Sequence, residues 1–379
     1  MQLIPVNERS LGGRELDYVT ECVRTGWISS TGRFVREFEE KWANYCGMKY
    51  GISVSNGTTA LQVAVRCLNL KPGDEIIMPT FTIISCALAI VEAGGIPVLV
   101  DCDPRTWCMD VKQVKDKITK RTRALLPVHI YGHPVDMDPL LALADQHDLI
   151  IIEDAAEAHG AEYLSERDTS RFSWRRCGGL GHISTFSFYA NKLITTGEGG
   201  MVLTNNNDYA DRVRGLRNLC FRHDRRFYHT ELGYNFRLTN LQSAIGLAQM
   251  ERIDEIIARK RWMGAAYTRR LSKIPTLQLP VQESWARQVY WMYGIVLNES
   301  TGMDASAFAH RLKEKGVDTR PFFLGMHEQP VFRNAGLFAG ETYPVAERIA
   351  RQGLYLPSGL TLSVEQLDHI CTSVEELLL

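Results

Sequence analysis

The chain has 379 residues, of which 45% are hydrophobic and 23% charged, and its formal net charge is −1. This length predicts one large domain plus a smaller one, and the charge gives no reason to expect a nucleic-acid or membrane-surface partner. The nine cysteines are scattered without a C-x-x-C pair, and we find no membrane-length apolar run or signal pattern, so we expect a cytoplasmic protein without a zinc knuckle or disulfide framework.

The first two-thirds of the chain alternates short apolar runs with helical patterns. The apolar runs are rich in β-branched residues and do not alternate, which is typical of strands buried on both faces of a parallel sheet. One intervening helix is expected to begin at Asp138-Pro139, with the aspartate as its N-cap. This rhythm predicts an α/β domain with a mainly parallel central sheet. The expected strands are 51–55, 75–79, 96–101, 124–131, 149–154, 184–189 and 200–204.

The last third has a different organisation. A long helix is expected from about Leu238 to about Leu271, and prolines then interrupt the chain. The run 289–297 and a helical pattern at 305–315 predict a second, smaller α/β unit. We therefore expect a large domain at 1–250 and a small C-terminal domain at 251–379.

Polar residues follow three of the expected strands. Gly57-Thr58 comes between the first strand and a helix, Asp154 ends the fifth, and Lys192 follows the sixth. Ligand sites of open parallel sheets lie beyond the carboxyl ends of the strands, and a helix N-terminus binds phosphate well. A phosphate cradle, an acid and a lysine are the groups that pyridoxal phosphate (PLP) chemistry needs. Separately, each is usually an ordinary turn, cap or surface residue, and their coincidence does not by itself single out PLP.

The segment around Lys192 carries a family resemblance. SFYANKLITTGEGGMVLT (187–204) resembles the lysine segment of the sugar-nucleotide aminotransferases, which are fold-type-I PLP enzymes. SNGTTALQVA, IEDAAEAHGA and LGYNFRLTNLQSAIGLAQMERID also resemble motifs of that family, and the resemblance spans nearly the whole chain. VHIYGHPVDMDP, DTRPFF and GLYLPSG are most similar to members that convert GDP-4-keto-6-deoxymannose to GDP-perosamine with glutamate as amino donor. Perosamine is typically a sugar of the lipopolysaccharide O-antigen.

The resemblance implies a role for each matched residue. It makes Lys192 the catalytic lysine that bonds to the cofactor, which argues against the related 3-dehydratases, where histidine replaces it. It makes Asp154 the partner of the pyridine nitrogen and places Glu157 beside the ring. Asn235 matches a residue that reaches the cofactor phosphate from the other subunit, which implies a homodimer with shared active sites. The implied phosphate ligands within the chain are Gly57, Thr58 and Ser187.

Two features depart from the family pattern. Ile83 stands where many members place a tyrosine or tryptophan on the PLP ring, and whether Ile83 or the nearby Phe81 packs there stays open. The stretch 164–182 is longer than usual and rich in arginine. We favour a solvated surface loop over cations that bind a diphosphate. Its arginines are Arg167, Arg171, Arg175 and Arg176.

Other candidates rest on weaker signals. His129 and His133 are four residues apart, but they flank a strand end rather than share a helix face, so we expect no metal site. We interpret His159 as a packing or hydrogen-bonding residue and Trp291 as small-domain core. The resemblance brings four residues near the sugar nucleotide, although Arg320 can equally be a structural ion-pair partner: Arg237, Arg320, Phe322 and His327.

Two alternatives to the GDP-sugar hypothesis stay open. One is an aminotransferase for a UDP- or dTDP-linked 4-keto-6-deoxy sugar, since a single sequence does not separate guanine from uracil or thymine. The other is a non-catalytic sensor that holds PLP, against which the intact Lys192 and Asp154 argue.

Overall fold

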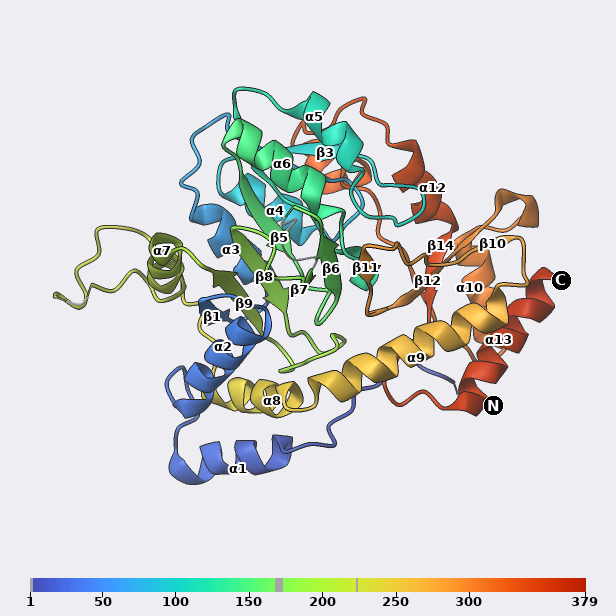
Figure 1. The fold of residues 1–379 in the computed structure, drawn as a ribbon, viewed down its shortest axis with the longest axis horizontal. Coiled ribbons are helices and arrows are strands. Elements are labelled where there is room, and N and C mark those ends of the chain that lie inside the picture. The colour runs from blue at the N-terminus through green and yellow to red at the C-terminus, as the bar shows by residue number, and fades with distance from the viewer. Residues whose placement is uncertain (1–2, 168–172, 223) are drawn as a thin grey trace.

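The computed structural model describes residues 3–167, 173–222 and 224–379. A seven-stranded sheet forms its centre, in the order β1-β9-β8-β5-β4-β2-β3 (Figure 1). β9 is antiparallel to both of its neighbours, and the other neighbouring strands are parallel. The predicted mainly parallel α/β fold is therefore confirmed. The strands are β1 (Tyr50–Val54), β2 (Glu75–Pro79), β3 (Ile96–Val100), β4 (Thr122–Leu125), β5 (Ile150–Asp154), β8 (Ile183–Ser187) and β9 (Gly200–Thr204).

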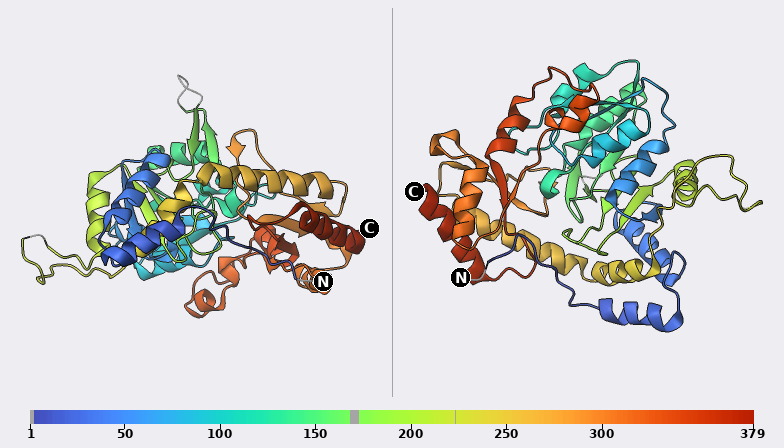
Figure 2. Two further views of the ribbon diagram at one scale, coloured as in Figure 1. Left: turned by 90° about the horizontal axis from the view of Figure 1, so that it is seen from below. Right: turned by 180° about the vertical axis from the view of Figure 1, so that it is seen from behind.

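Helices cover the central sheet on both sides (Figures 1 and 2). Strands β2, β8 and β9 are buried along their whole length, which accounts for their unalternating apolar sequences. No helix among the described residues is both long and apolar enough to cross a membrane. The helices of this part are α2 (Arg33–Tyr45), α3 (Gly57–Arg66), α4 (Ser85–Glu92), α5 (Val114–Lys117), α6 (Met137–His147) and α7 (Asn207–Arg217).

Two predicted boundaries near β4 and α6 are wrong. β4 ends at Leu125 instead of continuing to residue 131, because Pro127 has no N–H for the ladder and the chain turns at Tyr131, with φ 51°. The N-cap of α6 is Asp136, not Asp138. The Asp138 carboxylate instead accepts hydrogen bonds from the Ser165 hydroxyl and a following backbone N–H, both at 2.7 Å.

The expected long helix at 238–271 is two helices, α8 (Asn240–Met250) and α9 (Ile253–Leu271). A capping box between Thr239 and Gln242 begins α8, and the chain leaves helical geometry at Arg252, with φ −113° and ψ 13°. Apolar residues continue at helical spacing across this break, so periodicity alone did not reveal it.

The C-terminal part contains an antiparallel sheet in the order β10-β12-β14-β13. Its core includes the second half of α9 and also Ile4, whose N–H donates to the Gly316 carbonyl at 2.8 Å. The two termini lie at the same end of the molecule (Figure 1). The elements are β10 (Leu277–Gln278), β12 (Tyr293–Leu297), β13 (Arg320–Pro321), β14 (Gly353–Leu356), α10 (Ala305–Glu314), α11 (Pro330–Asn334), α12 (Pro344–Gln352) and α13 (Val364–Leu378). The exact boundary at residue 250 stays a prediction.

A third, smaller sheet stands beside the central one. The hairpin of β6 (Glu162–Ser165) and β7 (Ser173–Arg176) pairs with β11 (Ala286–Arg287) and projects from the body (Figure 2). The predicted surface loop at 164–182 thus contains a β-hairpin, of which residues 168–172 lie outside the described residues.

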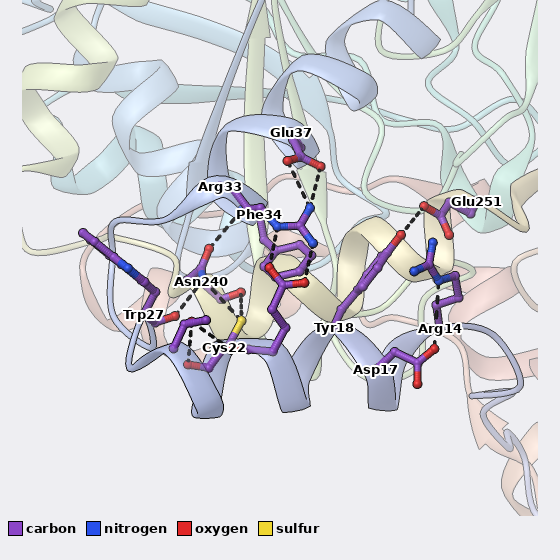
Figure 3. Close-up of polar contacts among 12 residues, drawn as sticks. Arg14, Asp17, Tyr18, Cys22, Trp27, Arg33, Phe34, Glu37, Asn240 and Glu251 are labelled. Atoms are coloured by element: carbon purple, nitrogen blue, oxygen red, sulfur yellow. Dashed lines mark hydrogen bonds and ion pairs between the residues drawn. The ribbon is translucent and has the colours of Figure 1, made fainter.

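Helix α1 (Glu15–Thr25) packs on α8 beside α2 through a buried asparagine (Figure 3). The Asn240 amide donates to the Trp27 carbonyl at 2.7 Å and to the Cys22 sulfur at 3.2 Å, and its oxygen accepts the Phe34 N–H at 3.1 Å. One side chain thereby connects α8 to α1, α2 and the loop between them.

We expect Asn240→Ala to lower the free energy of unfolding by about 2 kcal/mol, because it leaves buried polar groups without partners. Chemical denaturation of the purified variant measures the loss. Asn334→Ala, at an exposed position in α11, is the control and should stay within about 0.5 kcal/mol of the parent. An unchanged midpoint for Asn240→Ala would contradict the role of this hydrogen-bond cluster.

Candidate functional site

The carboxyl ends of β1, β5 and β8 meet at one edge of the central sheet. Val54 and Ser187 both lie opposite Gly200 of β9, and Asp154 lies opposite Thr185 of β8. The segment after β8 then carries Lys192 back over this edge. The structure thus brings together the three groups that the sequence placed at strand ends: a helix N-terminus, an acid and a lysine.

The N-terminus of α3 forms a narrow cradle against β8. Asn56 caps the helix in a capping box with Thr59, so the N–H groups of Gly57 and Thr58 belong to the first turn, where no intrahelical acceptor exists. A Cβ on Gly57 would lie 2.7 Å from the Cβ of Ser187, so only glycine allows this approach. The Thr58 hydroxyl lies 2.8 Å from that of Ser85. Amides and hydroxyls at a helix N-terminus suit a phosphate group.

Asp154 is buried at the end of β5. Its carboxylate accepts the Ala156 N–H at 3.0 Å and the thiol of Cys86 at 3.3 Å. Burial raises the pKa of Asp154 despite these donors. A buried carboxyl of this kind is stabilised in its charged form by a cationic N–H partner, so the site fits a protonated pyridine nitrogen. The contribution of Cys86 had no sequence signal, because a cysteine within an apolar helix is typical of a core.

Lys192 and Glu157 form a buried pair beside Asp154. Lys192 Nζ lies 3.8 Å from Glu157 Oε1, and the other carboxylate oxygen accepts the Tyr131 N–H at 2.7 Å. Burial raises the pKa of Glu157 to about 7 and lowers the pKa of Lys192. An amine with a lowered pKa is neutral more often near pH 7, which makes it a better nucleophile and proton carrier.

A ring of aromatic side chains encloses this pair. Tyr131 stacks on Phe323, and Trp291 lies with its ring face 3.6 Å from Lys192 Nζ. The interpretation of Trp291 as core was incomplete: the side chain is buried, but one face borders the lysine. The sequence could not show this, because the two residues are far apart along the chain.

Ile83 and Phe81 lie in different environments. Strand alternation would place these two residues, two apart in the sequence, on the same face, but β2 ends at Pro79, so alternation does not relate them. Phe81 is buried and packs 5.7 Å from Phe322, whereas Ile83 is 40% exposed. Ile83 is therefore the side chain with a free surface, and its contact with a cofactor ring stays a prediction.

The proposed substrate residues lie in two regions. Phe322 packs 4.8 Å from Tyr131, and the His327 ring contacts Thr80 at 2.8 Å and Glu347 at 3.2 Å. Both are buried near the end of β2. Arg320 is exposed and paired with Asp318 at 2.9 Å, as its structural interpretation predicted. A direct role of these residues in substrate binding stays a prediction.

Arg237 and Asn235 belong to the segment 224–239, part of which projects beside α7 (Figure 1). Asn235 is exposed and forms a β-bridge with Asn218, whose side chain accepts a hydrogen bond from Arg237 at 2.7 Å. Arg237 lines a cavity of about 1020 Å³ together with four other arginines. The chain by itself does not place Asn235 on a cofactor phosphate, so its role across subunits stays a prediction.

The arginines of the stretch 164–182 have local partners. Arg167 pairs with Asp145, Arg175 donates to the Gly179 carbonyl, and Arg176 donates to the Tyr45 carbonyl at 2.8 Å. Arg171 lies outside the described residues. The partners of the other three support the surface-loop interpretation.

His129 belongs to a buried hydrogen-bond network behind the site. Its Nε2 lies 2.9 Å from Glu153, its Nδ1 accepts the Val135 N–H at 2.9 Å, and the Cys177 sulfur lies nearby. The Glu153 carboxylate also accepts backbone N–H groups from the turn before β8. His133 instead donates to the Pro134 carbonyl at 2.7 Å.

His159 is fully buried between Trp42, Phe186 and Phe188, and neither ring nitrogen has a hydrogen-bond partner among the described residues. Burial, helped by the Lys192 charge, lowers the pKa of His159 to about 3. A histidine that is neutral when folded gains a proton on unfolding below about pH 6.5, so its contribution to stability is lost as the pH falls.

We therefore expect His159→Phe to flatten the acid side of the stability curve of the cofactor-free protein. Between pH 6 and pH 4, the slope of the free energy of unfolding against pH should be smaller in the variant than in the parent by about 1.4 kcal/mol per pH unit. Denaturation at several pH values measures it, and the exposed His310→Phe is the control. Parallel curves for His159→Phe and the parent would contradict a neutral buried imidazole.

Three comparisons place these observations among known proteins. The model of the DegT/DnrJ/EryC1/StrS aminotransferase family matches residues 9–375. GDP-perosamine synthase of Caulobacter vibrioides is 41% identical over 376 residues, covering 99% of this chain and 98% of that protein. GDP-perosamine synthase of Escherichia coli O157:H7 is 39% identical, covering 99% of each. The solved structure of DesV from S. venezuelae has a TM-score of 0.90 and 33% identity, covering 99% of this chain and 98% of that one.

Proposed function

Because the chain belongs to the DegT/DnrJ/EryC1/StrS aminotransferase family and is a PLP-dependent aminotransferase, we propose that it aminates carbon 4 of GDP-4-keto-6-deoxymannose to give GDP-perosamine. Glutamate is the amino donor in this proposal. Its main support is the likeness, over essentially the whole chain, to the two GDP-perosamine synthases. The buried group of Lys192, Glu157 and Asp154 supplies the chemistry such a transfer needs.

Each part of the site has a task in this proposal. PLP, when bound, accepts the electron pair left on a carbon that loses its proton. Asp154 holds the positive charge of the pyridine nitrogen, and Glu157 and Ile83 lie beside the ring. Lys192 would bond to the cofactor and, once released, would carry the proton from the donor carbon to the cofactor carbon, and back again in the second half-reaction. The phosphate would be held by the N–H groups of Gly57 and Thr58 and by the hydroxyl groups of Thr58 and Ser187.

A substrate panel tests the proposal. The purified protein with PLP and glutamate should release 2-oxoglutarate and an amino sugar from GDP-4-keto-6-deoxymannose. The UDP- and dTDP-linked 4-keto-6-deoxy sugars should react at least about tenfold more slowly, a discrimination within reach of a few base contacts. Turnover only of a UDP- or dTDP-linked sugar would reject the GDP assignment and keep the reaction class. A bound cofactor whose visible absorbance band does not change with glutamate would favour a sensor.

We also propose a homodimer in which Asn235 completes the active site of the partner subunit. Asn235 lies on a projecting segment that exposes large apolar side chains, with Phe227 76% and Leu232 82% exposed.

All nine cysteines are unpaired in the structure, which supports a reducing compartment such as the cytoplasm.

Subunit mixing tests the shared site. Lys192→Ala and Asn235→Ala protein, each of low activity, are dissociated together and reassembled. A mixed dimer then contains one site with both native residues, so activity should rise well above that of either variant alone. Recovery no greater than the average of the two would show that Asn235 serves its own subunit or neither.

A further inference from the structure

Trp291 lies directly against the amine of Lys192. The Nζ atom is 3.6 Å from the centroid of the indole ring, within the range of a strong cation–π contact. The same amine lies 3.8 Å from Glu157 Oε1. Both neighbours are buried, so water does not screen these interactions.

The indole ring is fixed at several points. Its Nε1–H donates to the Asn191 carbonyl at 2.9 Å, which ties it to the residue next to Lys192. The backbone carbonyl of Trp291 accepts a hydrogen bond from the buried amine of Lys260 at 2.8 Å, and the same amine donates to the Ser358 carbonyl at 2.6 Å. The ring also stacks on Tyr131, with 6.2 Å between centroids and an interplanar angle of 23°. A side chain held in this way cannot turn away from the lysine.

We propose that Trp291 is a positioning residue that holds the free Lys192 amine beside Glu157 and stabilises the ammonium that forms when the amine takes the donor proton. This inference rests on the proposed role of Lys192, because an aminotransferase lysine is released from the cofactor in the first half-reaction and stays free until the second half-reaction restores the bond. The released amine must then stay in place, take the proton from the donor carbon and hold it until it is transferred. An aromatic face stabilises the ammonium less strongly than a closely paired carboxylate does, so the proton stays available for transfer.

The charges around Lys192 explain why the aromatic face matters. Burial lowers the pKa of the amine, and the charges of Glu157 and Asp154 only partly counter it. Loss of the ring would remove one of the interactions that favour the ammonium, so the pKa should fall further. The other ionisable groups that border this amine or the small cavity it lines are His159, Glu8, Arg9 and Lys260.

The pKa of the Lys192 amine can be measured without turnover. The full-length, cofactor-free protein is labelled with trace acetic anhydride at a series of pH values, and mass spectrometry quantifies the Lys192 peptide. Relative to the parent, Trp291→Leu should lower the pKa by about 1 unit, and Trp291→Phe, whose ring is a weaker cation partner, by less. Trp174→Leu removes a comparable ring, 3.9 Å from Arg287, and is the matched control.

The pH profile of the glutamate half-reaction provides the second readout. In each Trp291 variant, the pKa that the profile assigns to Lys192 should shift by the same amount as in the labelling experiment. The pKa should be lowest in Trp291→Leu, higher in Trp291→Phe and highest in the parent. An unshifted or raised Lys192 pKa in both variants would overturn the proposal, even if their stability falls. Failure of the proposed function would differ, because the labelling shift would persist in a protein that does not turn over the sugar nucleotide.

Discussion

Lys192→Ala is expected to abolish amino transfer, with a rate loss of at least about 10⁴-fold, because in the proposed function one side chain supplies both the covalent attachment and the proton transfer. Lys192 Nζ lies 3.8 Å from Glu157 and 3.6 Å from the centroid of the Trp291 ring, and burial lowers the pKa of this amine. The half-reaction with glutamate should disappear together with full turnover. Rapid mixing with glutamate, followed through the absorbance of the bound cofactor, measures the first half alone.

The variant should still fold and bind the cofactor phosphate, because the cradle formed by Gly57 and Ser187 does not involve the lysine. Lys71→Ala removes an exposed lysine and serves as the control. Borohydride should fix the cofactor to the parent and to Lys71→Ala, but not to Lys192→Ala. Near-normal turnover by Lys192→Ala would reject the mechanism, whichever sugar nucleotide is the substrate.

The succession of strands along the chain and the position of Asp154 at the end of one of them were predictable from the sequence. Fully buried parallel strands leave long apolar runs, and the residue that ends each run necessarily lies at the sheet edge, as Asp154 does. The helix break at Arg252 and the early end of β4 were not predictable in this way. They depend on single backbone conformations that leave the apolar periodicity unchanged.

The neighbours of the site residues were not predictable either. Cys86 reaches Asp154 from α4, and Trp291 reaches Lys192 from the segment before β12. Both are apolar or weakly polar residues within apolar surroundings, so their local sequence is that of a core. Only the packing of distant segments shows which face of such a residue borders a reactive group.

Substitutions of two adjacent carboxylates of β5 should have different effects, one on the reaction rate and the other on stability. Asp154 and Glu153 are both buried, but they lie on opposite sides of the strand. Asp154 contacts Cys86 at the site, whereas Glu153 accepts hydrogen bonds from His129, Ser184 and backbone N–H groups. Although burial opposes it, these donors hold the pKa of Glu153 below its usual range. The first carboxylate is therefore arranged for a ligand and the second for the fold.

Asp154→Asn should lower the rate of the glutamate half-reaction by about 10²–10³-fold, the usual cost of removing one preorganised electrostatic partner. Its stability should change little, because the amide keeps the size of the carboxylate. Glu153→Gln should show the reverse: a loss of about 3 kcal/mol in the free energy of unfolding, because an amide cannot satisfy this many buried donors. Its folded fraction should retain the parent half-reaction rate. Rapid-mixing kinetics and chemical denaturation of both variants measure the two effects, and a near-normal rate for Asp154→Asn would contradict its role at the pyridine nitrogen.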